Sequence, residues 1–173
     1  MDHQLAVELS RGLAIVGAGL AVSLACSGSG KGIGIASQTA GGVLSEKPEL
    51  FGRLLVLLAL PGTQGFYGFI TAILIFQRAG FISGELVCTP GTGIALLMIG
   101  LGVGLAEYIT AVWQGEASSA AIALVARRPD AYGRSIILPA MVETYAVVSL
   151  LIGILAINWL TSDKGAILEF LRQ

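Results

Sequence analysis

Four long apolar stretches, separated by short segments that carry most of the charges, run along the chain. They cover residues 12–45, 54–77, 86–127 and 135–162. An α-helix needs roughly 20 residues to cross a hydrocarbon core about 30 Å thick, and each stretch is long enough. The pattern therefore predicts an all-α membrane protein with four transmembrane helices.

The composition argues against a small soluble domain. Hydrophobic residues make up 55% of the 173 residues, charged residues only 12%, and the mean hydropathy is +0.84. One compact core could not bury that much apolar surface. The net charge of −1 argues against a nucleic-acid partner. Cys26 and Cys88 lack the spacing of metal ligands and His3 stands alone, so no Cys/His metal site is predicted.

Basic residues cluster in the loops that follow the first and third apolar stretches. They are Lys47, Arg53, Arg127, Arg128 and Arg134. By the positive-inside rule these loops face the cytoplasm. Both termini and the 78–90 connection are then expected outside, in a multi-pass protein of the cell membrane.

One motif occurs twice. Residues 48–53 read Pro-Glu-Leu-Phe-Gly-Arg and residues 129–134 read Pro-Asp-Ala-Tyr-Gly-Arg, an offset of 81. Each copy lies in the loop of a predicted hairpin, where proline can begin a helix because its missing N–H is not needed. We predict two tandem parallel hairpins, 1–81 and 82–162, and an interfacial tail, 163–173. Inverted repeats, common in secondary transporters, are disfavoured because a two-helix unit returns to its starting side.

Small residues crowd the first helix of each hairpin. The glycines are Gly17, Gly19, Gly28, Gly30, Gly32 and Gly34, and then Gly91, Gly93, Gly100, Gly102 and Gly104. Glycine costs about 1 kcal/mol relative to alanine in a helix, so such a run needs a reason. In a membrane the reason is close approach of helix backbones. Alternate glycines cover more than one face, which favours a helix crowded on both sides, as in a closed ring of identical subunits.

The fourth stretch contains one charged residue, Glu143, near its middle. A carboxylate there is costly unless it is protonated, paired or bound to a cation, so an intramembrane acid indicates function. The alternative is a structural carboxylate neutralised by a fixed basic residue. Lys31 and Arg53 are expected near the cytoplasmic ends of their helices, too far away to serve. The equivalent position in the first hairpin is Gly62, so only the second hairpin carries a carboxylate at this mid-membrane position.

Oxygen-bearing side chains could accompany Glu143. The candidates are Thr63, Gln64, Gln114 and Thr144. Pro61 frees a backbone carbonyl one turn earlier, and Gly62 leaves space for an ion or a side chain. Such a shell of oxygens suits a hard cation, whereas a proton needs only a carboxylate in an apolar pocket. Tyr67 could hold Glu143 ionised through a hydrogen bond. Sodium is therefore favoured, with H+ as the alternative.

Nearly the whole chain resembles the proteolipid rotor-ring (K or c) subunit of bacterial sodium-translocating V-type ATPases. The resemblance is carried by the glycine-rich first helix, PGTQGFYG, WQGEASS, RRPDAYGRS and MVETYAV. It implies a ring that rotates against a stator while Glu143 loads and unloads one ion per turn. The implied sodium ligands are the Leu60 backbone carbonyl and the side chains of Thr63, Gln64, Gln114 and Glu143, with Tyr67 closing the site.

The resemblance also implies partners: identical subunits, a stator subunit that supplies a basic residue, central-stalk subunits and membrane lipid. ATP hydrolysis is expected in other subunits. One acid for two hairpins would favour more force per ion over more ions per ATP. A small four-helix multidrug antiporter is less favoured, since it would need an acid in the first helix and no duplication. A purely structural or pore-forming proteolipid would leave Glu143 without a purpose.

Two features depart from the pattern expected of that family. One is the segment from Thr161 onward. The other is Glu107, seven residues before Gln114 and therefore roughly 10 Å away along the helix axis. Glu107 is expected to line the inner side of the ring or to reach an interface, rather than to form a second ion site.

Overall fold

The computed structural model describes residues 3–84 and 88–162, and the predicted tail lies outside this part of the chain. Four long helical segments are apolar enough to cross a membrane, which confirms the predicted all-α membrane fold. The first helix of each hairpin is continuous: α1 spans His3–Glu46 and α4 spans Pro90–Arg127. With 44 residues, α1 is about 66 Å long, roughly twice the hydrocarbon thickness.

The second helix of each hairpin is interrupted. Its pieces are η1 (Pro48–Leu50), α2 (Phe51–Ala59), η2 (Leu60–Gly62) and α3 (Thr63–Arg78), and then η3 (Pro129–Ala131), α5 (Tyr132–Ser135) and α6 (Ile137–Leu160). Prolines explain the breaks, because a proline cannot donate to the carbonyl four residues earlier. Pro61 lies within η2, and Pro139 leaves the carbonyl of Ser135 without that donor, where α5 ends.

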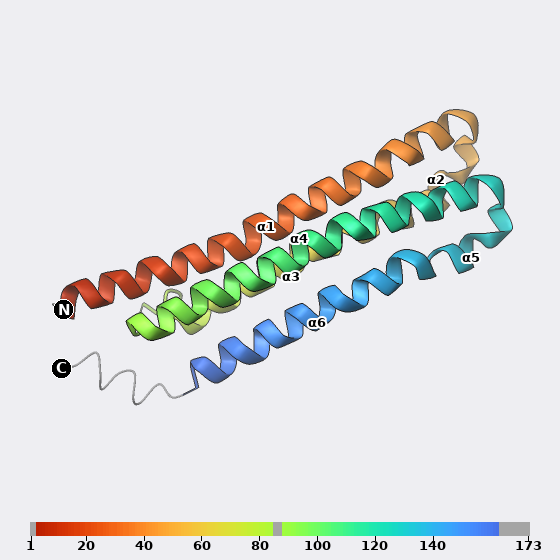
Figure 1. Cartoon of the computed structure of the whole chain (residues 1–173). Helices are drawn as coiled ribbons and strands as arrows, with labels where there is room; N and C mark the ends of the chain where they lie inside the picture. Colours follow the sequence, from red (N-terminus) through yellow and green to blue (C-terminus); the bar gives the residue numbers. More distant parts are fainter. Residues whose placement is uncertain (1–2, 85–87, 163–173) are drawn as a thin grey trace.

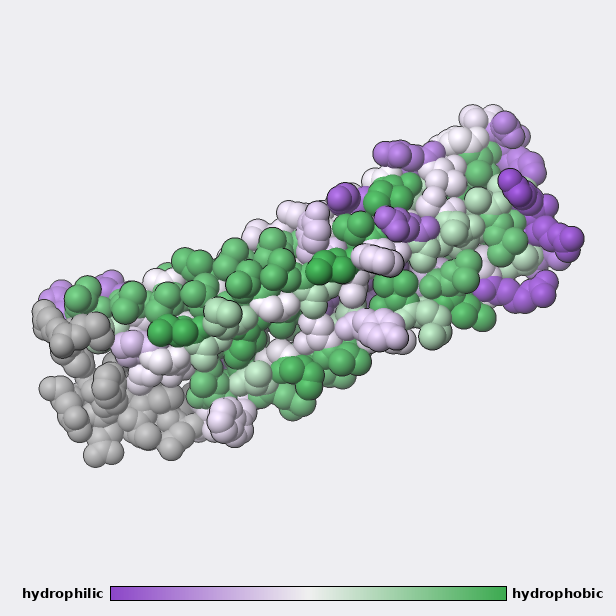
Figure 2. All heavy atoms as spheres, viewed as in Figure 1, coloured by the Kyte–Doolittle hydropathy of each residue, from purple (hydrophilic) through white to green (hydrophobic). Residues whose placement is uncertain are grey.

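The helices lie alongside one another in a long bundle (Figure 1). The most extensive contact joins α1 to α4, while α3 packs on α1 and α6 packs on α4. The loops of both hairpins lie at one end, and the start of α1 and the end of α6 lie at the other (Figure 1). Hydrophilic residues gather towards the loop end, and hydrophobic residues cover much of the rest of the face in Figure 2. The hairpins are therefore parallel.

Glycines allow α1 and α4 to meet backbone to backbone. A Cβ atom added at Gly100 would overlap the carbonyl group of Gly17, and one added at Gly115 would overlap the backbone of Gly32. One added at Gly28 would lie 2.5 Å from the Cα atom of Tyr108. The predicted close approach is thus present along one face of α1.

A second set of glycines on α1 has open space. Nothing lies within 4 Å of a Cβ atom added at Gly12, Gly19, Gly30 or Gly34. These residues alternate with the ones that contact α4, so they lie on a different face of α1. Each of these glycines lowers the stability of the helix, and no close backbone contact within the single chain compensates for that loss.

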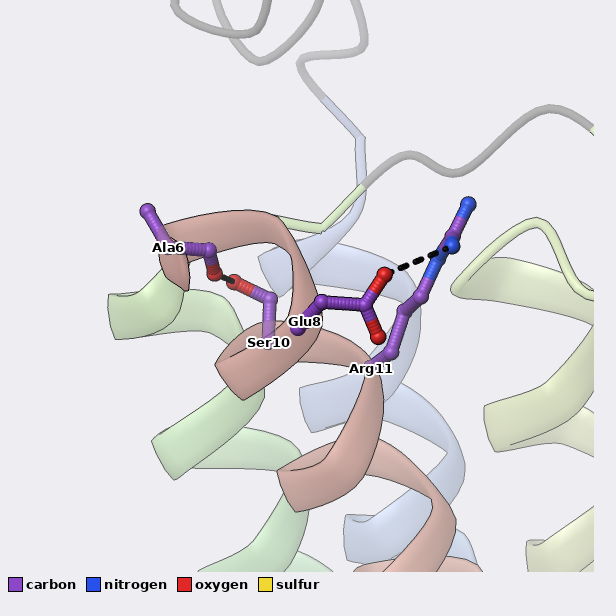
Figure 3. Close-up of polar contacts among 4 residues, drawn as sticks. All are labelled: Ala6, Glu8, Ser10 and Arg11. Atoms are coloured by element: carbon purple, nitrogen blue, oxygen red, sulfur yellow. Dashed lines mark hydrogen bonds and ion pairs between the residues drawn. The ribbon is translucent and has the colours of Figure 1, made fainter. Parts of the chain in front are cut away.

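The start of α1 is polar and its charges are partly offset (Figure 3). Arg11 forms an ion pair with Glu8, with 3.3 Å between Nη1 and Oε1, and the Ser10 hydroxyl donates to the carbonyl oxygen of Ala6 at 2.7 Å. Both contacts lie in the first turns of α1, at the end of the bundle opposite the hairpin loops.

We predict that Gly100→Ala destabilises the protein. The new methyl group would meet the backbone of Gly17, so α1 and α4 would have to separate, at a cost of about 1–3 kcal/mol. Thermal unfolding in detergent, followed by loss of helical circular dichroism, should show a lower midpoint. Gly52→Ala is the matched control, because a Cβ atom there meets nothing within 4 Å. Equal midpoints for the two variants would contradict the proposed backbone contact.

Candidate ion-binding site

Glu143 lies on α6 and accepts hydrogen bonds from three side chains. The Tyr67 hydroxyl donates to Oε1 at 2.5 Å, and the Thr63 hydroxyl and the Gln114 amide reach Oε2 at 2.8 and 2.7 Å. The donors come from α3 and α4, so three helices meet at this carboxylate. Glu143, Thr63 and Tyr67 are half-buried, whereas Gln114 is fully buried.

Two buried glutamines connect α3 to α4 beside the carboxylate. The Gln64 amide donates to Oε1 of Gln114 at 2.5 Å, and the Gln114 amide also donates to the carbonyl oxygen of Pro139 at 3.1 Å. Both side chains are 0% exposed. Because the amide nitrogen of Gln64 is used in this way, its oxygen is left to face Thr63.

Three acceptor oxygens surround the hydroxyl of Thr63. The Leu60 carbonyl lies 3.0 Å from Thr63 Oγ1, Gln64 Oε1 lies 3.3 Å away and Glu143 Oε2 lies 2.8 Å away. A threonine hydroxyl has one hydrogen, so it can satisfy only one of the three. Hard cations hold oxygen ligands at roughly 2.0–2.6 Å, so oxygens that share a cation lie about 3–3.5 Å apart. The spacing of these oxygens suits a small hard cation.

The break in the second span presents the Leu60 carbonyl to this cluster. Pro61 has no N–H, and the chain turns through η2 before α3 begins at Thr63. The Thr63 N–H bonds to the Leu60 carbonyl three residues back, as in a tightened turn. The carbonyl freed by the missing N–H of Pro61 is that of Leu57, four residues earlier, so the Leu60 carbonyl reaches the cluster through the tightened turn of η2 instead.

The prediction that Thr144 accompanies Glu143 at the site is wrong. Its side chain is exposed, and its hydroxyl donates to the carbonyl oxygen of Met141 on its own helix at 2.8 Å. One residue along a helix turns the side chain by about 100°, so the neighbour of Glu143 points away from α3. The prediction that Gly62 leaves space for a side chain is confirmed, because Ile33 of α1 lies 3.3 Å from a Cβ atom added at Gly62.

The prediction that Lys31 lies near the end of its helix is also wrong. Because α1 continues to Glu46, Lys31 lies well inside it, next to Gly32 at the level of Ala111 and Gly115. Its side chain is exposed. Within residues 3–84 and 88–162 the ion pairs comprise only Arg11 with Glu8, so no basic residue of this part neutralises Glu143.

Glu107 is buried inside the subunit. Its side chain is 0% exposed, and neither carboxylate oxygen has a hydrogen-bond partner in the described part of the chain. The prediction that it lines the inner side of the ring or reaches an interface is therefore wrong. The signal was available, since seven residues return nearly to the same face of a helix and Gln114 faces the interior. No group of three His, Cys, Asp or Glu residues close enough to share a metal occurs within the described ranges.

A family model that describes the C subunit of ATP synthase matches the chain twice, at residues 16–75 and 97–156. The two matches are offset by 81 residues, as in the repeated loop motif. Together they cover more than half of the chain. The chain belongs to the ATP synthase C-subunit family. The duplicated hairpin predicted from the sequence is thereby confirmed as two copies of this family's unit.

Several curated members of the family are similar to the chain. The A-type ATP synthase subunit K of Methanocaldococcus jannaschii is 41% identical over 83% of this chain, which spans 60% of that relative. The V-type sodium ATPase subunit K of Enterococcus hirae is 32% identical over 91% of this chain and 97% of its own length. The ATP synthase c-subunit of Clostridium novyi is 40% identical over 41% of this chain and 88% of its own length.

We predict that Gln114→Leu destabilises the subunit. The leucine would remove bonds to Glu143 and Pro139 and leave the buried Gln64 amide without its acceptor, at a cost of about 1–3 kcal/mol for the orphaned group. Thermal unfolding in detergent is the measurement. Thr144→Val is the control, since it removes only an exposed hydroxyl bonded to its own helix. The prediction fails when the leucine variant unfolds no earlier than the control.

Proposed function

We propose that the chain is the rotor-ring subunit of a rotary A/V-type ATPase and that Glu143 carries Na+ across the membrane. The observation that carries the proposal is the crowding of three acceptor oxygens around Thr63 Oγ1 next to the carboxylate. The name of the Enterococcus hirae relative, a V-type sodium ATPase subunit K, supports the same ion. The names of all three relatives connect the family to ATPases or ATP synthases.

The proposed sodium ligands are five oxygen donors. They are the Leu60 carbonyl and the side chains of Thr63, Gln64, Gln114 and Glu143. Gln114 would turn its amide group to bind the ion, because its oxygen accepts from Gln64 and its nitrogen faces Glu143 in the structure. A sodium ion among the ligands would neutralise the carboxylate and give the Gln64 oxygen a partner that the Thr63 hydroxyl cannot supply while it bonds to Glu143. Tyr67 would close the site by its bond to the other carboxylate oxygen.

Rotation follows from charge balance. A carboxylate that faces lipid must be neutral, so the ring can turn through the bilayer only while Glu143 is loaded. A basic residue of a stator subunit would lower the cation affinity and release the ion. Central-stalk subunits would couple the turning ring to ATP hydrolysis elsewhere in the complex. We place the hairpin loops in the cytoplasm and both termini outside, following the basic residues of the loops.

Coupling to H+ is the alternative, because a proton can also neutralise Glu143. It would leave the Gln64 oxygen without a ligand to bind, because the single Thr63 hydroxyl hydrogen is shared with Glu143. Sodium uses the whole cluster, and we favour it for that reason. A four-helix antiporter is disfavoured by the family and by the duplication.

A ring also accounts for the open glycines of α1. The two hairpins are equivalent at an offset of 81 residues. In a ring, each contact between the first and second hairpins of one chain should therefore have an equivalent between the second hairpin of that chain and the first hairpin of the next copy. The contact of Gly17 with Gly100 becomes one between Met98 and Gly19 of the next copy. The contact of Gly32 with Gly115 becomes one between Trp113 and Gly34 of the next copy.

The loops follow the same rule. Lys47 donates to the carbonyl oxygen of Ala126 at 2.6 Å, and Arg53 donates to that of Pro129 at 3.1 Å. Their equivalents one repeat later are Arg128 and Arg134, also basic. In a ring, Arg128 and Arg134 would donate hydrogen bonds to loop carbonyl oxygens of the next copy. The same loop-to-loop hydrogen bonds would then recur between all neighbouring copies.

The ring arrangement also suggests what occupies the position in the first hairpin that is equivalent to the Glu143 site. A groove of about 450 Å³ on α1 and α3 is lined in part by Ile33 and Gly62, the equivalents of Gln114 and Glu143. The offset places Tyr145, the equivalent of Gln64, against this groove of the next copy. Tyr145 is 71% exposed in one chain. We infer that its ring fills the groove where an ion site would otherwise lie.

The decisive experiment for the ion is carbodiimide labelling of the detergent-solubilised ring. A carbodiimide reacts with a protonated carboxyl group, so bound sodium should protect Glu143 at constant pH. Mass spectrometry of the peptides would locate the adduct. Protection by acidity alone, unaffected by sodium, would exclude the sodium site and leave the proton rotor.

A matched pair of variants tests the ligand shell. Thr63→Val removes the hydroxyl at the centre of the oxygen cluster. We expect the sodium concentration that halves carbodiimide labelling of Glu143 to rise by at least about tenfold. Thr144→Val removes a hydroxyl that points away from the site and should leave the sodium requirement unchanged. An equal sodium requirement for the two variants would remove Thr63 from the proposed ligands.

The ring geometry predicts a cross-link. With Cys26→Ser and Cys88→Ala as background, the pair Gly19→Cys and Met98→Cys should form disulfides between copies under mild oxidation. A denaturing gel should then show a ladder of covalent oligomers, because each copy offers one partner on each side. Pairing Met98→Cys with Gly52→Cys, at the loop end, should give none. A band that stops at the dimer would contradict a ring.

A further inference from the structure

Glu107 is the one fully buried charged side chain that the proposed sodium site does not use, among the residues that the structure describes. Its exposure is 0% within a single chain, so its burial does not depend on neighbouring copies. Neither carboxylate oxygen has a hydrogen-bond partner in residues 3–84 and 88–162. An ionised carboxylate in such a place would pay the full cost of desolvation without compensation.

Small residues make the room for this side chain. At neighbouring turns of α4, Gly104 packs against Ala21 of α1, and the backbone of Tyr108 packs against Gly28. Ala25 of α1 lies between these levels and is 0% exposed. None of these neighbours offers a charge or a side-chain hydrogen bond to Glu107.

The titratable groups around Glu107 do not include a buried cation. Tyr67 on α3 and Glu143 on α6 interact with it electrostatically, and the Tyr67 hydroxyl is already given to Glu143. On the other elements packed here, the titratable side chains near this level are the exposed Cys26 and Lys31 of α1 and Tyr108 of α4. Among the described residues no hydroxyl or amide group bonds to the Glu107 carboxylate, in contrast to Glu143, so the ligand that fits is a single proton.

We propose that Glu107 is a second ion-binding position of the subunit, specific for a proton. It lies roughly 10 Å from Gln114, on the side away from the hairpin loops. Its neutral carboxyl group fills the interior between the hairpins while Glu143 handles the transported ion. The equivalent residue of the first hairpin is Cys26, so this position, like the sodium site, occurs once per chain.

The proton is linked to the transported ion through charge. Loss of the proton would place a negative charge roughly 10 Å from the site and raise cation affinity there by about tenfold at an effective dielectric constant near 20. By reciprocity, a cation at the site would weaken proton binding at Glu107 by the same factor. This linkage rests on the proposed function, whereas the proton at Glu107 does not.

Infrared spectroscopy of the purified ring tests the proton directly. Glu143→Gln removes the transport carboxylate, so the outcome does not depend on which ion it carries. At neutral pH this variant should retain the carbonyl stretch of a neutral carboxyl group in an apolar environment, and adding Glu107→Gln should abolish it. Glu116→Gln, which changes an exposed acid on the same helix, should leave the band intact. Absence of the band from Glu143→Gln, or its persistence in the double variant, would overturn the proposal.

Glu107→Asp guards against a double variant that does not fold. It keeps a protonated acid, so in the Glu143→Gln background the band should shift in frequency without disappearing. An unshifted band would assign it to another residue and overturn the proposal.

Sodium protection against carbodiimide, measured from neutral to alkaline pH, tests the linkage. The wild-type ring should gain about tenfold in sodium affinity as Glu107 loses its proton, and Glu107→Gln should lack this gain. The same pH dependence in both would overturn the linkage. Absence of any sodium effect at Glu143 would instead count against the proposed transported ion, while the infrared band still decides the proton.

Discussion

A carboxylate in a medium that cannot solvate it must be neutralised, and much of the architecture of this protein can be understood from that constraint. Glu143 meets it by drawing donors from two other helices: Thr63 and Tyr67 from α3, and Gln114 from α4. The break at Pro61 brings the Leu60 carbonyl into the same cluster. In the proposed function a cation completes the neutralisation, and transport consists of supplying and removing it.

Backbone contact at a distance from the site makes this convergence possible. Gly17 and Gly32 of α1 lie directly against Gly100 and Gly115 of α4, which fixes the register of the two hairpins. Gln114 adjoins the second of these contacts in sequence, and its amide reaches both Pro139 and Glu143. The glycines therefore contribute to the geometry of the site without touching it, because a shift of α4 along α1 would move Gln114 away from its partners.

The sequence predicted the spans, the repeat and the residues that gather around Glu143, because each leaves a local signature: an apolar run, a repeated motif, or a polar residue in an apolar helix. The predictions failed for residues whose contacts depend on how the helix is rotated about its axis. Thr144 adjoins Glu143 in sequence yet points away from the site. Lys31 was placed too near the end of its helix, although the apolar stretch 12–45 already indicated that the helix continues well past it. The burial of Glu107 was missed although its spacing of seven residues from Gln114 places both side chains on nearly the same face of α4.

The length of α1 has a mechanical consequence. At about 66 Å it is roughly twice as long as the hydrocarbon core is thick, so part of it extends beyond the hydrocarbon. Two helices held backbone to backbone have few flexible side chains between them that could shear. In the proposed ring, a collar of such helix pairs would resist twisting, so torque applied at the loops would reach the carboxylates with little elastic loss.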